Sequence, residues 1–317
     1  MKTENPFKYS DTNKRYHTLT YYNKQKFGCK VFKISLNGGF TCPNIDGTVG
    51  KGGCTYCSGQ GSGDFAGNPH KSITEQFDDV RKLMEHKWHG KYIAYFQAFT
   101  NTYAPVEVLK QKYEEALNQE NVVGLAIATR ADALPEDVLD YLEELSKKTY
   151  LVVELGLQTI YDETGVRINR GHTYSQFENA VKELQRRGIN VSAHIINGLP
   201  GETHEMMVET AKKIATLGLH GVKIHLLHVI EGTRMAQQYK NGEFELMTRE
   251  DYVNTVCDQL EYFPPELVIE RVTGDGAKDT LIGPLWSLKK LVVINEIDKE
   301  MSRRNSYQGI KYQSLKK

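Results

Sequence analysis

Residues 122–159 read VVGLAIATRADALPEDVLDYLEELSKKTYLVVELGLQT, and they define the unit from which this chain is expected to fold. Two apolar runs flank a segment that begins at Pro135, carries acidic residues in its first turn and has apolar residues at helical spacing. Strands that are apolar along almost their whole length are typical of parallel sheets covered on both faces. The stretch therefore predicts a strand, a helix and a second, parallel strand.

The same unit repeats along most of the chain. Strands are predicted at residues 30–36, 91–99, 122–130, 149–159, 189–197 and 221–229, with helices at 73–88, 105–118, 134–148, 173–188 and after 202. Six units are fewer than the eight of a closed barrel, so we expect an α/β fold with a partial (β/α)6 TIM-like barrel. A doubly wound sheet is the alternative, and in both folds the chemistry gathers at the carboxyl ends of the strands.

Beyond residue 232 the pattern becomes mainly helical. Helices are predicted at residues 248–263 and 284–304, and residues 265–276 are compatible with a seventh strand. We expect three parts: a basic N-terminal segment (1–27), the barrel core (28–232) and a C-terminal helical extension with a basic tail (233–317).

The charge of the chain balances, with 40 basic and 40 acidic residues, but both ends are basic. Residues 1–40 carry eight basic and two acidic residues, and residues 286–317 carry eight and three. If the two ends lie side by side, they form a basic face suited to a phosphate backbone, and their tyrosines can stack on bases. These tyrosines are Tyr9, Tyr16, Tyr21, Tyr22, Tyr307 and Tyr312. Solvated ends that bind nothing are the alternative.

The sequence has no apolar run long enough to span a membrane, and its first residues, MKTENPFKYS, lack the apolar core of a signal peptide. We therefore expect a cytoplasmic protein without a membrane partner. Thiols stay reduced in that compartment, so a tight group among the five cysteines favours metal binding or catalysis over disulfides.

Three cysteines lie in one glycine-rich loop, NGGFTCPNIDGTVGKGGCTYCSG, at residues 37–59. Cys42, Cys54 and Cys57 favour an iron–sulfur cluster, with zinc and unliganded thiols as the alternatives. A structural zinc site needs four ligands, and no fourth candidate has a typical spacing. Three thiolates on four irons leave one iron open to another ligand. Cys29 and Cys257 are expected to be small buried residues.

The order of motifs along the chain resembles the radical S-adenosylmethionine (SAM) superfamily. After CPN and GGCTYC come ELGLQT (154–159), NRGHT (169–173), AHIINGLPGET (193–203), GVKIHLLHVIEGT (221–233) and ERVTGD (270–275). This order is similar to the radical domain of the Elongator catalytic subunit and to its shorter bacterial relatives of the YhcC/YtqA type. The gap of eleven residues between the first two cysteines departs from the superfamily's commonest spacing of three.

The resemblance implies a partial barrel of the radical SAM type, a 4Fe-4S cluster, SAM as cofactor and an external electron donor of the flavodoxin or ferredoxin type. The Elongator subunit carries an acetyltransferase domain after its radical domain, and the residues after the last predicted helix are too few to build one. Acetyl transfer is therefore not implied.

The resemblance also implies roles for residues in the first four strand ends. The cluster ligands would be Cys42, Cys54 and Cys57. Thr100 and Asn101 correspond to the strand end that meets the methionyl amine. Glu154 and Gln158 resemble a pair near the ribose, and residues four apart on a strand point to the same side. A buried Glu154 needs a partner, so a structural ion pair is the alternative.

Further residues are assigned in the later motifs. Arg170 would clamp the methionyl carboxylate, because a guanidinium suits a carboxylate, and a surface arginine is the alternative. His194 lies on the strand that faces the cofactor in the family, with a buried, satisfied histidine as the alternative. Lys223 shares a face with His225 and is the leading candidate for substrate contact, unless it pairs with Glu154 or Glu231. Arg271 is assigned to the same cavity.

Two functional hypotheses follow for an enzyme of this superfamily. The first is modification of tRNA at the C5 substituent of a wobble uridine, which the Elongator resemblance implies, with no DNA partner. The second is radical chemistry on a small metabolite or porphyrin. A non-enzymatic tRNA-binding protein with a structural cluster is a third reading, and the intact cysteine and strand-end motifs argue against it.

Overall fold

A computed structural model describes residues 5–61, 63, 65–85 and 90–316 of the chain. The chain divides into two compact units, which are described separately. We call Asn23–Gly156 with Asn169–Ser192 the cysteine unit, because it contains the cysteine loop. Met1–Tyr22, Leu157–Ile168 and Ala193–Lys317 form the histidine unit.

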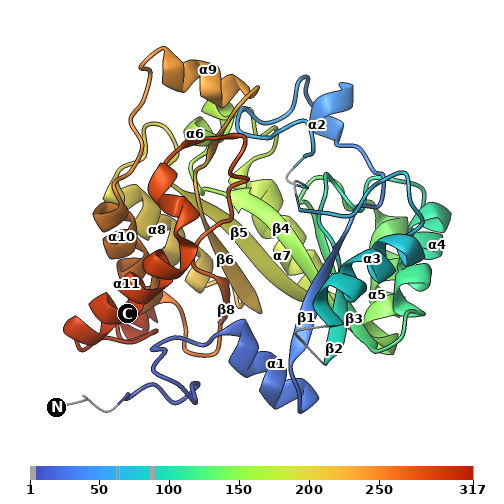
Figure 1. The fold of residues 1–317 in the computed structure, drawn as a ribbon, viewed down its shortest axis with the longest axis horizontal. Coiled ribbons are helices and arrows are strands. Elements are labelled where there is room, and N and C mark those ends of the chain that lie inside the picture. Colours follow the sequence, from blue (N-terminus) through green and yellow to red (C-terminus); the bar gives the residue numbers. More distant parts are fainter. Residues whose placement is uncertain (1–4, 62, 64, 86–89, 317) are drawn as a thin grey trace. The chain divides into compact units, whose positions relative to one another are not determined.

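The strands follow one another in sequence order across a seven-stranded sheet, β1-β2-β3-β4-β5-β6-β8 (Figure 1). They are β1 (Val31–Leu36), β2 (Lys91–Phe96), β3 (Val122–Arg130), β4 (Tyr150–Gln158), β5 (Asn190–Asn197), β6 (Gly221–Leu226) and β8 (Val268–Arg271). The predicted α/β fold with an open, partial barrel is confirmed, because β1 and β8 are the two ends of this order. The sheet has seven strands rather than six, since the segment compatible with a further strand does form β8.

The helices of the cysteine unit alternate with its strands. They are α2 (Pro43–Asp46), α3 (Ile73–Glu85), α4 (Val106–Leu117), α5 (Glu136–Lys148) and α7 (Tyr174–Arg186). Figure 1 shows α3, α4 and α5 beside β1, β2 and β3. Prolines at 105 and 135 directly precede α4 and α5, and Thr173 caps α7 through a capping box. The predicted helix at 73–88 ends at Glu85, and residues 86–89 lie outside the described residues.

The two faces of the cysteine unit's strands differ in chemistry. Phe96 packs edge-on against Tyr113 of α4 at 4.9 Å, so its face is the one the helices cover. Its register partners Leu36 and Ile127 are, like Phe96, fully buried on that face. The opposite face, set by the alternation of side chains, carries Lys33 and Glu154. The charged side chains of Lys33 and Glu154 therefore lie on the face opposite the helix-covered one.

The histidine unit contains the remaining helices and a small antiparallel sheet. The helices are α6 (Asp162–Arg167), α8 (His204–Ala215), α9 (Arg234–Lys240), α10 (Arg249–Tyr262) and α11 (Lys290–Arg303), with η1 (Leu285–Leu288) and η2 (Tyr312–Lys316). β7 (Val229–Ile230) pairs with β9 (Leu281–Gly283). Residues 284–304 form η1 and α11 rather than the single predicted helix, because the backbone leaves helical geometry at Lys289. The short helices α2, α6 and α9 were not predicted, nor was α1 (Leu19–Phe27), which has residues in both units.

Segments near the two ends of the chain lie side by side within the histidine unit, which is the condition that a shared basic face requires. Gln308 donates its backbone N–H to the carbonyl of Arg15 at 2.9 Å, and its side-chain oxygen accepts from His17 N at 2.8 Å. Tyr16 is only 4% exposed, so it is buried in the core and is not available to stack on bases. Among the described residues of the two basic ends (1–40 and 286–317), at least six basic residues have acidic partners: Lys14 with Asp298, Lys33 with Glu154, Lys290 with Asp275, Arg303 with Glu300, Arg304 with Asp258 and Glu300, and Lys311 with Glu261.

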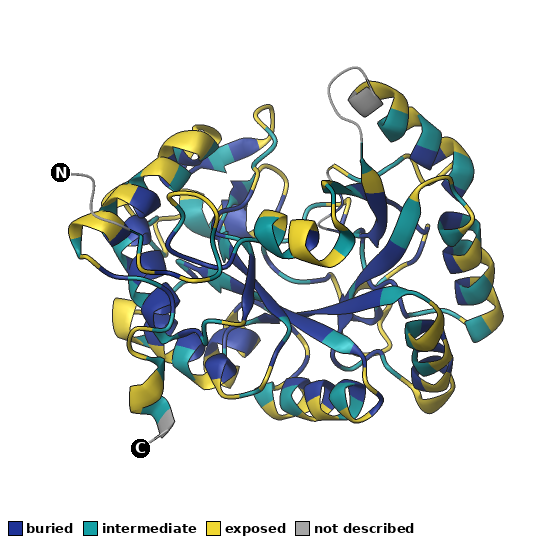
Figure 2. Cartoon of the chain, turned by 90° about the horizontal axis from the view of Figure 1, so that it is seen from below, coloured by how far each residue is buried: buried dark blue, intermediate teal, exposed yellow. Residues whose placement is uncertain are grey.

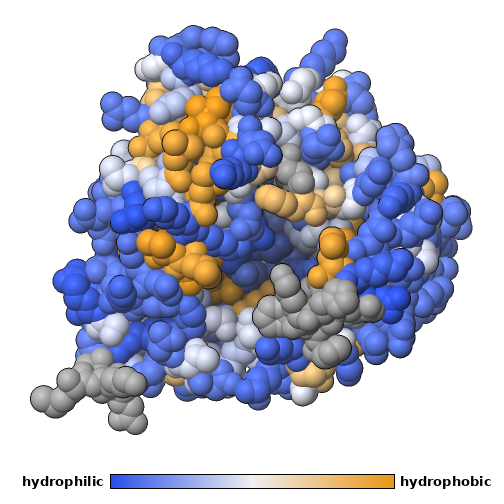
Figure 3. All heavy atoms as spheres, viewed as in Figure 1, coloured by the Kyte–Doolittle hydropathy of each residue, from blue (hydrophilic) through white to orange (hydrophobic). Residues whose placement is uncertain are grey.

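Burial follows the pattern expected of strands covered by amphipathic helices. Figure 2 shows most strand residues as buried, whereas the helices have one buried and one exposed side. Hydrophilic residues cover most of the face drawn in Figure 3, and apolar residues form separate patches on it. Across the described residues, the helices are all too short or too polar to cross a bilayer.

Candidate functional site

Two asparagines fasten the cysteine loop to the segment that follows α6. Asn44 Nδ2 donates to the carbonyl of Asn169 at 2.6 Å and lies 3.6 Å from Cys54 Sγ. Asn169 Nδ2 in turn donates to the carbonyl of Gly53 at 2.7 Å. Gly171 has φ +81°, and a Cβ there would stand 2.7 Å from Asn44 Oδ1, so only glycine fits this approach. The NRG part of NRGHT therefore holds the loop in place.

The surroundings of Cys54 lower the pKa of its thiol. The hydrogen bond with Cys57 lowers its pKa to about 6, and burial opposes this effect. The positive charge of Arg130 and hydrogen bonds from Tyr56 and Asn44 lower the pKa further. The thiolate is the form that binds metals, so this lowered pKa favours the form in which Cys54 can act as a ligand.

A buried arginine pair supplies the positive charge. Arg130, at the end of β3, holds Asp132 with two hydrogen bonds of 2.9 and 2.7 Å and donates to the carbonyl of Arg170 at 2.7 Å. Its charge acts on Cys42 and Cys54. Arg170 is 1% exposed and donates from Nε to the carbonyl of His172 at 2.8 Å, so the surface-arginine alternative is wrong. Burial and these two arginines lower the pKa of His172 to about 4.

The end of β2 carries two polar atoms that have no partner. Thr100 N donates to the carbonyl of Thr41 at 3.2 Å, which ties the strand end to the cysteine loop. Asn101 Nδ2 donates to the carbonyls of Phe96 and Ala128. Thr100 Oγ1 and Asn101 Oδ1 are buried without hydrogen-bond partners, which is costly unless a ligand meets them.

Glu154 and Gln158 lie on β4 but in different units. Glu154 is fully buried and pairs with Lys33 Nζ at 2.6 Å, and Lys33 also lies 5.1 Å from the ring centre of Tyr95. The expectation that Glu154 has a partner is confirmed. Gln158 has φ +65°, so the extended geometry behind the same-side argument fails at that residue. Its Oε1 is buried without a partner.

The histidine unit brings the other predicted residues together. Lys223 on β6 is the register partner of Arg271 on β8, so both leave the same face of the sheet. The ring of His194 lies 5.2 Å from that of His225. Glu231, one of the expected alternative partners of Lys223, pairs with Lys240 at 2.9 Å, and Arg271 lies 3.4 Å from Asp275.

The structure adds residues that the sequence did not reveal: Asn44, Lys33, Arg130, Asp132, Asn169 and His228. Arg130 carried a usable signal, because it ends an apolar strand at the edge where chemistry is expected. Lys33 could have been found by the alternation that places it on the face of Glu154. The asparagines act through backbone contacts across more than 100 residues, which no local pattern reports.

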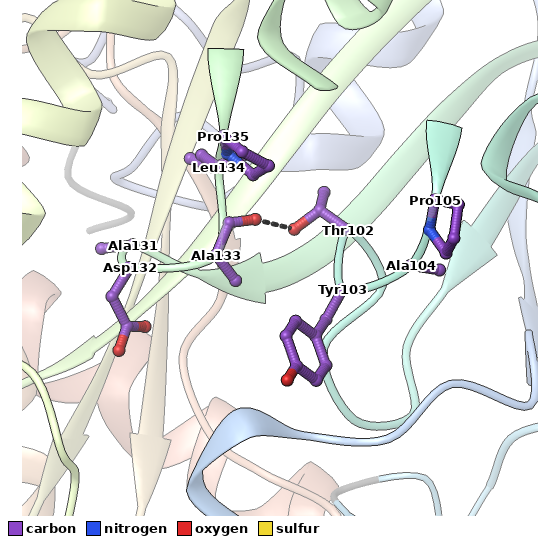
Figure 4. Close-up of a pocket in the computed structure, with 9 residues that line it drawn as sticks. All are labelled: Thr102, Tyr103, Ala104, Pro105, Ala131, Asp132, Ala133, Leu134 and Pro135. Atoms are coloured by element: carbon purple, nitrogen blue, oxygen red, sulfur yellow. Dashed lines mark hydrogen bonds between the residues drawn. The ribbon is translucent and has the colours of Figure 1, made fainter. Parts of the chain in front are cut away.

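A surface cavity of about 760 Å³ lies between the loops that follow β2 and β3 (Figure 4). Tyr103 and Asp132 point to one side of it, and Thr102 joins the two loops by donating to the carbonyl of Ala133. Tyr103 OH is 2.8 Å from Thr48 Oγ1 of the cysteine loop. The cavity is therefore a neighbour of that loop and shares Asp132 with the arginine pair.

The cysteines do not form a site for a single metal ion. In the parts of the chain that the structure describes, no three His, Cys, Asp or Glu side chains converge in that way. A zinc ion needs all its ligands within about 2.3 Å of one point, whereas each cysteine ligand of a 4Fe-4S cluster binds its own iron. The arrangement is thus compatible with a cluster.

Comparison with protein families places the chain. The model of the radical SAM superfamily matches residues 46–214, and that of the Radical_SAM C-terminal domain matches residues 219–303. The first match contains Cys54 and Cys57 but begins after Cys42. The chain therefore belongs to the radical SAM superfamily and is a radical SAM enzyme.

Individual relatives show which members of the superfamily this chain is similar to. YtqA of Bacillus subtilis (strain 168) is 55% identical over 316 residues, which cover 99% of this chain and 98% of that protein. The tRNA uridine(34) acetyltransferase of Methanocaldococcus infernus is 31% identical over 156 residues, 48% of this chain and 29% of the relative. The structure of M. infernus Elp3 with an N-terminal deletion aligns with a TM-score of 0.66 at 20% identity, covering 89% of this chain and 67% of that one. That alignment shows a shared fold.

Proposed function

We propose that this radical SAM enzyme holds a 4Fe-4S cluster through Cys42, Cys54 and Cys57, binds SAM, and modifies the C5 substituent of a wobble uridine in tRNA. The observation that carries the proposal is the cysteine loop, where the half-buried Cys54 thiol, with a lowered pKa, lies beside the buried Arg130. The cluster and SAM, once bound and reduced by a flavodoxin- or ferredoxin-type donor, supply a 5′-deoxyadenosyl radical.

The residues of the cysteine unit fit these cofactors. Arg130 places positive charge beside Cys42 and Cys54, which would stabilise an anionic cluster, and its contact with the Arg170 carbonyl holds it there. The unpartnered oxygens of Thr100 and Asn101 can accept hydrogen bonds from an ammonium group, which is what the amine of SAM offers. Arg170 reaches a carboxylate only if part of its guanidinium is free of the backbone contacts around His172.

The roles of the remaining residues are proposals of the same kind. Glu154, joined to Lys33, and Gln158, with its unpartnered Oε1, would contact the ribose of SAM. His194 would contact the cofactor from β5, and Lys223 and Arg271 would contact the substrate from β6 and β8. These last three lie within the histidine unit.

Two observations support tRNA as the substrate: the similarity to a relative that acts on tRNA, and the basic residues near the two ends of the chain. A relative that acts on uridine 34 of tRNA matches about half of this chain. The two basic ends meet, with Tyr9 stacked on His17 at 5.0 Å, but acidic partners neutralise at least six of their described basic residues. The electrostatic support is thus smaller than the residue count alone indicates.

Mass spectrometry of nucleosides from tRNA tests the proposal. Cells that lack this protein should lose one modified wobble uridine or accumulate its precursor, and the wild-type gene should restore the profile while Cys54→Ala should not. An unchanged profile would refute the tRNA substrate. If the purified protein still released 5′-deoxyadenosine with dithionite, radical chemistry on a small metabolite or porphyrin would take its place.

A further inference from the structure

The histidine unit contains a group of basic side chains on one face of its strands. Lys223 and Arg271 are register partners, and His225 follows Lys223 by two residues on the same face. The His194 ring lies 5.2 Å from that of His225. His228, just past the end of β6, approaches His225 at Gly274: a Cβ there would stand 3.2 Å from His228 Cε1 and 3.8 Å from His225 Nδ1. We call Lys223, His225, His228 and Arg271 the cationic cluster.

Two nitrogen atoms of the cationic cluster lack hydrogen-bond partners. The Nε2 atoms of His225 and His228 are buried and lack hydrogen-bond partners. A buried polar atom without a partner costs free energy, and a ligand that meets it recovers that cost. Burial and the neighbouring positive charges lower the pKa of His225, and burial lowers that of His228 to about 4. A neutral imidazole can still donate a hydrogen bond from Nε2.

The acid beside Arg271 is shared with a second cation. Asp275 accepts hydrogen bonds from Lys290 at 2.7 and 2.8 Å, whereas it lies 3.4 Å from Arg271. Glu270 precedes Arg271 at the register shift between β6 and β8 and has its own interaction. Arg271 therefore keeps donors for another acceptor, because an arginine carries five N–H groups in a planar fork.

We propose that the cationic cluster binds a phosphate group of the substrate nucleotide. Donors from two strands and a following loop converge there, and a phosphate, with more oxygens than a carboxylate, can accept from all of them. Arg271 is the last residue of β8, His225 is the last but one of β6 and His228 follows that strand, so these three lie toward the carboxyl ends, where substrates bind in folds of this class. The inference rests on the proposed function, since a nucleic-acid substrate carries one phosphate per nucleotide.

Calorimetric titration of the anaerobically reconstituted, full-length protein tests the inference. Uridine monophosphate should bind about tenfold or more tightly than uridine, because a charge-assisted hydrogen-bond set is lost with the phosphate. Arg271→Met should abolish most of that difference. Arg249→Met removes an arginine from an exposed pair with Glu296 and should leave both affinities unchanged. Gly274→Ala keeps every charge but presses a methyl group against the two histidines, and it should also weaken the nucleotide.

Two results would overturn the inference. Equal affinities for uridine monophosphate and uridine would show that no phosphate is recognised. Displacement of the nucleotide by acetate as readily as by inorganic phosphate would assign the cluster to carboxylates. The proposed function fails separately, through an unchanged tRNA nucleoside profile. A phosphate preference found together with such a profile would support the inference and place the phosphate on a nucleotide other than tRNA.

Discussion

The cysteine loop and the cationic cluster both gather charged and nucleophilic groups, but they do so by different means. In the loop, side chains bind backbone atoms from distant segments, as Asn44 and Asn169 do. In the cluster, Lys223 and His225 are positioned by the alternation of a regular strand, and Arg271 by register.

This difference has a consequence for mutations. A loop without regular hydrogen bonding depends on every side chain that holds it. Substitution of these supporting residues should therefore lower the stability of the protein strongly. A strand keeps its position when one outward side chain changes, so substitutions in the cluster should alter binding with little loss of stability. The four predictions below test this contrast, from the largest expected effect to the smallest.

Iron binding should depend completely on the loop. Cys54→Ala removes one of three proposed ligands, and we expect the iron content after anaerobic reconstitution to fall from about four per chain to near zero. Cys29→Ala is the matched control, because Cys29 lies outside the loop. The expectation that Cys29 is buried is wrong, since it is half-buried, whereas Cys257 is buried as expected. Iron analysis and the visible absorption of the cluster measure both variants. Equal iron in the two variants would contradict the assignment of the ligands.

Breaking the ion pair between Arg130 and Asp132 should destabilise the protein. Asp132→Asn leaves buried Arg130 without its carboxylate, and removal of one partner of a buried pair costs about 3–5 kcal/mol. Asp140→Asn is the matched control, because Arg187 keeps three further carboxylates from Glu136, Glu143 and Glu183, so its cost should be about 1 kcal/mol or less. Urea denaturation measures both. Similar losses would show that the loop does not depend on this support.

The sequence predicted the fold well because its signals are periodic. The apolar runs located the seven strands of the main sheet, but the small sheet of β7 and β9 was not predicted. The strand at 122–130 was placed with its correct bounds. The short helices α2 and α6 were not predicted, because four to six residues are too few to show helical periodicity. The division of the last helical region at Lys289 was not predicted either, because the apolar spacing continues through that residue.

The candidate site was predictable only in part, for a related reason. Cysteine spacing and strand alternation identify Cys54 and Lys223 from a few neighbouring residues. The contacts of Asn169 with the loop depend on how segments over 100 residues apart pack, and a positive φ such as that of Gln158 leaves no mark in the sequence. Supporting residues therefore became visible only in the structure.

Acid should lower the stability of the protein through His172, whose pKa is lowered by burial and in part by Arg170 and Arg130. Burial lowers the pKa of His172 to about 4 from an ordinary value near 6.5, so between these values the unfolded chain binds the extra proton and stability falls as the pH falls. We expect wild type to lose on the order of 2 kcal/mol more than His172→Gln between pH 7 and pH 4.5.

Urea denaturation at both pH values measures that difference. His204→Gln is the control, because His204 is largely exposed and binds Asp258 at 3.0 Å, and it should show the same acid loss as wild type. A His172→Gln variant as acid-sensitive as wild type would show that this histidine is not held neutral. The remaining acid loss should come from the histidine unit, where His228 also has a lowered pKa.

The smallest effect concerns the cap of α7. Thr173 caps that helix in a capping box with Gln176 and directly follows the segment that holds the loop, whereas Thr248 caps α10 in the histidine unit. Thr173→Ala and Thr248→Ala should each lower the free energy of unfolding by about 1 kcal/mol, because each removes one cap hydrogen bond. Hydrogen exchange distinguishes them: only Thr173→Ala should speed exchange at Asn169 and Arg170. Unchanged exchange there would mean that the asparagine contacts hold the segment without help from the helix.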